Sequence, residues 1–95
     1  MSGPRRRHDP PRGPLVGLAE LAASRRRLLG LTQRATAELA DVGISSIYAL
    51  EEGSDRLRLE ILMRILDTLG LALVVAPPAT LPTDPQVVIL NDQRP

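Results

Sequence analysis

Residues 31–53 read LTQRATAELADVGISSIYALEEG, and this stretch decides the fold. The hydroxyl of Thr32 can accept a backbone N–H at the start of a helix, which predicts a helix over 33–40. A break follows at 41–43, where Asp tolerates left-handed or turn geometry and Gly adopts it without steric cost. A second helix is predicted over 44–52. The stretch therefore predicts two short helices joined by a tight turn.

A supporting helix is predicted on each side of this pair. Apolar residues at 15, 18, 21, 22, 28 and 29 form one stripe at helical spacing, which indicates a helix over 15–29. A stronger amphipathic pattern indicates a helix over 58–69. Glycines are expected to end three of the four helices, because glycine is common just after a helix. These glycines are Gly30, Gly53 and Gly70.

An apolar run at 71–76 has the length of a strand, and the prolines that follow it prevent its continuation. The folded middle of the chain offers no second strand, so the backbone groups of this run lack a partner edge. The simplest partner is the same strand of a second copy, related by a two-fold axis. We therefore predict a homodimer whose contact residues are Leu71, Leu73, Val74 and Val75.

All nine prolines lie outside 15–76, which we take as the folded domain. Residues 1–14 are predicted to be a disordered basic arm, and its arginines either follow DNA or are simply solvated. Residues 77–95 are predicted to be a proline-rich tail. Its apolar patch at 87–90 is either a short strand that docks on a partner protein or a chance cluster in a disordered tail.

Composition excludes several classes of protein. The chain has 95 residues, a net charge of +1 and no cysteine, so a small core without disulfides or thiolate metal sites favours oligomerisation. The one histidine, His8, lies in the arm, and no glycine-rich phosphate loop or nucleophile elbow is present. We predict no catalytic residues, metal or cofactor, and hence no enzyme. No apolar run approaches the roughly 20 residues of a membrane span, and a cytoplasmic location is expected.

The central stretch resembles the pattern LTQxxLAxxxGVSxxxIxxLExG of the Xre family of helix-turn-helix proteins, of phage-repressor type. The resemblance covers about 15–76 and implies an all-α, four-helix domain like that of lambda repressor. The predicted strand after Gly70 is most similar to that of HipB-type antitoxins, where it builds an intersubunit sheet. Thr36 replaces the family's usual core leucine, Asp41 its turn glycine and Gly43 its serine N-cap. The matching residues are Leu31, Thr32, Gln33, Ala37, Val42, Ile47, Leu50, Glu51 and Gly53.

The resemblance implies that the helix over 44–52 enters the major groove of DNA, with Ile47 and Leu50 turned inward. Tyr48 has a rival role in packing or in contact with a partner protein, and the arginines have a rival role as solvated surface residues. Base contacts are expected from Ile44, Ser45, Ser46, Tyr48 and Ala49, and phosphate contacts from Gln33, Arg34, Arg56 and Arg58.

None of the expected base-contacting side chains makes a bidentate hydrogen bond, so DNA shape is expected to share the discrimination between sequences. Arg26 and Glu51 are assigned instead to a structural ion pair. Gln33 has the alternative role of a simple helix-start residue.

The leading functional hypothesis is a HipB-like antitoxin that represses its own operon as a dimer. Two recognition helices would meet successive major grooves of a pseudo-palindrome, about 34 Å apart. A HipA-like kinase toxin is the partner that the resemblance implies. The alternatives are a stand-alone Xre-type repressor and a protein-interaction module that has lost DNA binding. The near-neutral charge and the apolar recognition surface favour the last of these.

Overall fold

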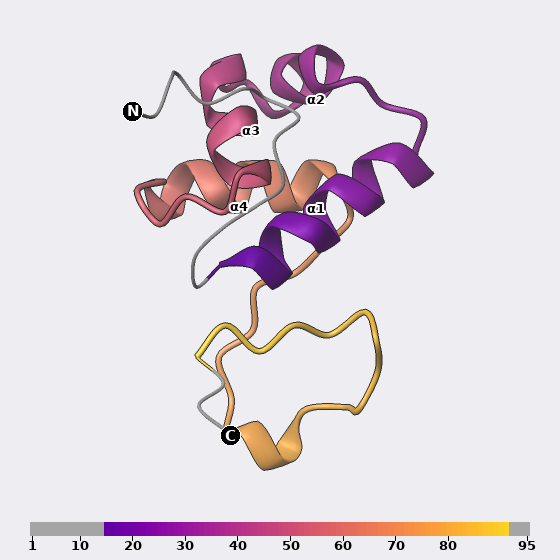
Figure 1. The fold of residues 1–95 in the computed structure, drawn as a ribbon, viewed down its shortest axis with the longest axis vertical. Helices are drawn as coiled ribbons and strands as arrows, with labels where there is room; N and C mark the ends of the chain where they lie inside the picture. The colour runs from indigo at the N-terminus through magenta and orange to yellow at the C-terminus, as the bar shows by residue number, and fades with distance from the viewer. Residues whose placement is uncertain (1–14, 92–95) are drawn as a thin grey trace, which may run out of the picture.

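The computed structural model describes residues 15–91, so the predicted basic arm lies outside the described residues. Four α-helices follow one another as α1 (Val16–Leu28), α2 (Gln33–Ala40), α3 (Ile44–Glu51) and α4 (Leu59–Thr68). A 3-10 turn, η1 (Pro78–Thr80), lies in the tail (Figure 1). Each α-helix begins and ends within one residue of its predicted bounds, which confirms the all-α, four-helix prediction.

The core lies where α3 meets α1, α2 and α4. Ile47 and Leu50, the two inward residues of α3, are 1% and 3% exposed. Burial of a side chain of this size contributes roughly 1.5–3 kcal/mol. The small residues on the facing helices let α3 approach closely. The other buried core residues are Leu18, Ala22, Ala37, Ala40, Ile65, Leu66 and Leu69.

All four helices end in the same backbone motif. A residue one or two positions beyond each helix has a positive φ, and the N–H of the residue after it bonds to the carbonyl five positions back, a Schellman motif. Glycine supplies the positive φ at three helix ends, and Asp41 supplies it after α2 with φ 57°. The N–H bonds join Leu31 to Arg26, Val42 to Ala37, Ser54 to Ala49 and Leu71 to Leu66, at 2.8–3.0 Å.

The burial of α2 residues shows how the turn between α2 and α3 aligns with the Xre-type sequence pattern. Thr36, Ala37 and Ala40 are buried, whereas Leu39 is 65% exposed. This is the pattern expected if Gln33 and Glu51 align with the family pattern without a gap. The hydroxyl of Thr36, which replaces a core leucine, donates to the carbonyl of Thr32 at 2.8 Å, so this buried polar group is satisfied within its own helix.

The strand predicted over 71–76 is absent from the part of the chain that the structure describes. A strand needs a second edge to pair with, and a single copy of this chain supplies none there. Leu71 instead packs against the core, while Leu73, Val74 and Val75 are exposed, Val75 to 97%. The prediction of a C-terminal strand is therefore not borne out.

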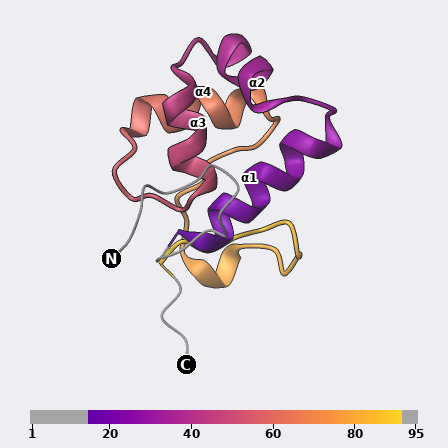
Figure 2. The same ribbon diagram turned by 45° about the horizontal axis from the view of Figure 1, so that its top comes forward.

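The tail turns back toward the helices. In Figures 1 and 2 the chain after η1 passes beside the N-terminal part of α1. Val87, Val88 and Ile89 are half-buried, so the apolar patch packs on its own chain. Neither of the two alternatives raised for this patch, a partner-docking strand or a disordered tail, describes that arrangement. None of the helices in the described residues is long and apolar enough to cross a bilayer.

Substituting Asp41→Gly should stabilise the domain by about 1 kcal/mol, because a left-handed backbone strains any residue with a Cβ. Asp41→Ala is the matched control and should destabilise it, since alanine has the Cβ without a side chain that favours this geometry. Urea unfolding monitored by circular dichroism measures both effects. A wild type more stable than Asp41→Gly would contradict this account of the turn.

Candidate nucleic-acid interface

The outer side of α3 is more covered than its sequence suggests. Of the five residues predicted to contact bases, Ser45 alone is exposed, and the other four are partly buried. Ile44 packs against the hydrophobic core, which leaves it less available to DNA than predicted. Ser46, Tyr48 and Ala49 are partly buried. The free surface of α3 is therefore centred on its N-terminal turn.

A bidentate ion pair fixes the C-terminal end of α3. Nε of Arg26 donates to Oε2 of Glu51 at 2.7 Å, and the Nη2 atom of the same guanidinium donates to Oε1 at 3.1 Å. The two side chains are only 13% and 9% exposed. The Nη1 atom of Arg26 also donates to the carbonyl of Leu31, at 2.9 Å. One guanidinium thus joins α1, α3 and the loop before α2, in the role predicted for it.

Gln33 belongs to the same cluster. Its Nε2 atom donates to Oε1 of Glu51 at 3.2 Å, so this side chain, predicted to contact phosphate, is held by the ion pair. The preceding residue, Thr32, caps α2 by accepting from the N–H of Ala35 at 3.0 Å. The first-turn N–H groups of Gln33 and Arg34 point out of the helix end and have no carbonyl partner in it. They give this end of α2 a partial positive charge.

Exposed arginines flank α3. Arg34 lies in the first turn of α2, and Arg56 and Arg58 lie in the connection between α3 and α4. Figures 1 and 2 place α2 and this connection on opposite sides of α3. The side chain of Ser54 accepts from the N–H of Arg56 at 3.2 Å, which orders the connection. The fold therefore brings all three predicted phosphate-contacting arginines to the borders of one helix.

Sequence reasoning missed two features of the site. Gln33 is predicted to contact DNA, yet its amide donates to Glu51 and orients that carboxylate. The two residues are eighteen positions apart, so their contact is not local in the sequence. Ile44 is predicted on the outer side of α3, but it lies three residues before Ile47 and therefore shares the helix face that packs on the core. The spacing of Ile44 and Ile47 is a local signal for the contact of Ile44 with the core, whereas the contact between Gln33 and Glu51 has no local signal.

A family model described as helix-turn-helix matches residues 23–75, which is more than half of the chain. The matched segment begins in the second half of α1 and includes α2, α3, α4 and most of the run that follows Gly70. No curated protein matches the chain.

Replacing Arg26 with Met should cost about 3 kcal/mol of stability, because it leaves the Glu51 carboxylate largely buried without its cation. The double variant Arg26→Met with Glu51→Leu should recover part of that loss. Glu60→Gln is the control, since it breaks an exposed pair with Arg64 that spans 3.5 Å. That change should cost less than about 1 kcal/mol. Equal losses for Arg26→Met and Glu60→Gln in urea unfolding would refute the structural role.

Proposed function

This chain belongs to the helix-turn-helix family, Xre-like in its pattern, and from that premise we propose that it is a homodimeric, sequence-specific transcriptional repressor. The observation that carries the proposal is the placement of α3. Ile47 and Leu50 hold one side of this helix in the core, and the opposite side carries the exposed Ser45 between two arginine-bearing borders. An α-helix presented in this way fits the major groove.

Base recognition in this proposal rests mainly on Ser45, with Ser46, Tyr48 and Ala49 beside it and a smaller contribution from Ile44. The hydroxyl of Ser45 can donate to or accept from several base edges, so it discriminates weakly by itself. Sequence-dependent DNA shape supplies the rest of the specificity. The side chain is small, which lets the backbone of α3 approach the bases closely.

Phosphate contacts are proposed for Arg34, Arg56 and Arg58. Gln33 is given a different role from the phosphate contact predicted from the sequence. By bonding to Glu51 it fixes the start of α2 relative to α3, so the helix N-terminus, rather than the Gln33 amide, meets a phosphate. Phosphate contacts on both sides of α3 would set the depth and angle at which it enters the groove.

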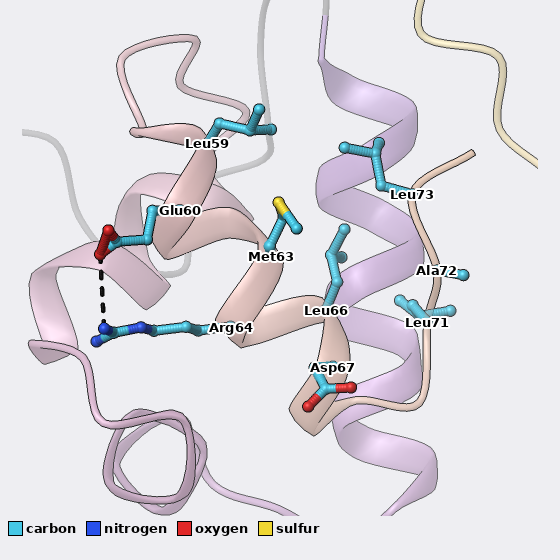
Figure 3. A pocket seen from close by; sticks show the side chains of 9 residues that line it. All are labelled: Leu59, Glu60, Met63, Arg64, Leu66, Asp67, Leu71, Ala72 and Leu73. Atoms are coloured by element: carbon cyan, nitrogen blue, oxygen red, sulfur yellow. Dashed lines mark ion pairs between the residues drawn. The ribbon is translucent and has the colours of Figure 1, made fainter. Parts of the chain in front are cut away.

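The proposed dimer surface is a groove between α4 and the run that follows it, mostly apolar but also lined by Glu60, Arg64 and Asp67. This α4 groove has a volume of about 730 Å³ (Figure 3). Leu59 and Met63 line it from α4, and Leu73 lines it from the opposite wall; they are 59%, 53% and 42% exposed. Val74 and Val75, which follow Leu73 in the chain, are 62% and 97% exposed. In a two-fold dimer, the exposed apolar segment of each copy can fill the groove of the other copy.

A second copy is thus the proposed occupant of the α4 groove, with Leu73, Val74 and Val75 as contact residues. Leu71 contributes only indirectly because it packs on its own core. A toxin partner of the HipA kind is not included in the proposal. The apolar patch at 87–90 that motivated an antitoxin role packs largely on its own chain, which favours a stand-alone repressor.

Arg34→Ala and Arg56→Ala should each weaken binding to every DNA sequence and lower the slope of log affinity against log salt by about one. Ser45→Ala should instead alter the preference between DNA from upstream of its own gene and scrambled DNA. Fluorescence anisotropy at two or more salt concentrations measures both. Thr83→Glu, which lowers the net charge equally in the exposed tail, should leave the slope unchanged. Binding no tighter to upstream than to scrambled DNA would favour the protein-interaction module instead.

Met63→Asp should convert the dimer to a monomer, because it places a charge in an apolar contact that two-fold symmetry repeats. Sedimentation velocity over a concentration series measures the change. Leu39→Asp is the control, as Leu39 is equally exposed but lies on α2, away from the α4 groove. A wild-type chain that sediments as a monomer, or a Met63→Asp variant that still dimerises, would rule out this interface.

A further inference from the structure

The returning tail forms one wall of a second cavity, partly open to solvent, which we name the tail cavity. It has a volume of about 330 Å³ and lies between α1, the run after α4 and the tail. Leu18 and Leu21 line it from α1 and Leu66 from α4, while Leu81 and Val87 line it from the tail. Both ribbon views place the tail along this side of α1 (Figures 1 and 2). No residue of α3 lines the tail cavity, so it is separate from the DNA-binding surface.

A specific contact positions the tail over the cavity. Gly17 lies in the first turn of α1, and a Cβ added there would stand 2.9 Å from Cγ1 of Val88. That separation is shorter than two carbon atoms tolerate, so only glycine leaves room for Val88 at this place. Glycine is also a poor helix former, which makes its presence inside α1 a cost to the helix. The contact with Val88 explains why a glycine lies at this position although it destabilises the helix.

The lining defines what could fill the tail cavity. Among the described residues that line it, Gln86 alone has a polar side chain. A buried water needs about two to four polar partners, so this lining holds water poorly. An empty space of this size is also unfavourable, because its walls lose dispersion contacts. Ligand sites have volumes of roughly 300–1,000 Å³, and a dry cavity of about 150 Å³ already takes up benzene.

We propose that the tail cavity is a binding site for a small, uncharged, apolar molecule with at most one hydrogen-bonding group. Leucine and valine side chains from α1, α4 and the tail surround the hydrocarbon part. The amide of Gln86 offers one donor and one acceptor to the polar group. A charged ligand would lose its hydration without gaining a counter-charge, which excludes it.

The uncharged dye N-phenyl-1-naphthylamine tests the proposal, because its fluorescence rises when it enters an apolar site. Titrated into the full chain, it should bind saturably with one molecule per chain. Gly17→Ala should weaken binding at least tenfold, since the new methyl group displaces Val88 and opens the cavity. Alanine favours the helix, so this variant should keep its circular dichroism spectrum and its thermal transition. Val87→Asp should weaken binding similarly by placing a carboxylate in the lining.

Two controls locate the dye. Leu39→Asp changes an exposed apolar residue outside the lining and should leave the affinity unchanged. Leu28→Asp changes a second exposed apolar residue that lines neither the tail cavity nor the α4 groove, and it should also leave the affinity unchanged. The proposal is overturned by a wild type without saturable binding, by equal affinities of Gly17→Ala and the wild type, or by loss of binding in Leu28→Asp. None of these outcomes depends on whether the chain binds DNA.

Discussion

The pairing of one guanidinium with one carboxylate determines how three helices of this domain meet. Arg26 reaches from α1 to Glu51 at the end of α3, and Gln33 brings the start of α2 to the same carboxylate. Apolar packing alone leaves a short helix some freedom to slide or rotate, because dispersion has no direction. Directional hydrogen bonds at 2.7–3.2 Å remove that freedom. The orientation of α3 and the position of the α2 N-terminus are therefore set together, and both belong to the proposed DNA surface.

Local chemistry made most of the helical domain predictable. The apolar stripes of α1 and α4, the Thr32 cap and the glycines after three helices act over a few residues, so the sequence displays them directly. The register of the turn followed from the spacing of Gln33 and Glu51, and the buried Ala37 and Ala40 agree with it. The flanking positions of Arg34 and Arg56 followed from the family pattern rather than from any periodicity.

The rest depended on contacts between distant parts of the chain or on a second molecule. The run at 71–76 has strand composition, but a strand exists only where a second edge pairs with it, and composition does not supply that edge. The return of the tail depends on Val88 and on the absence of a side chain at Gly17, and a missing side chain leaves no pattern to detect.

The aromatic content of the chain has a practical result. Tyr48 is the one aromatic residue in a sequence without Phe or Trp, and it lies on α3. All intrinsic ultraviolet emission of the protein therefore originates in the helix proposed to enter DNA. Quenching, anisotropy or a spectral shift of that single fluorophore would report on the surroundings of α3 without any label or substitution. The unmodified chain thus contains its own optical probe at the site of greatest interest.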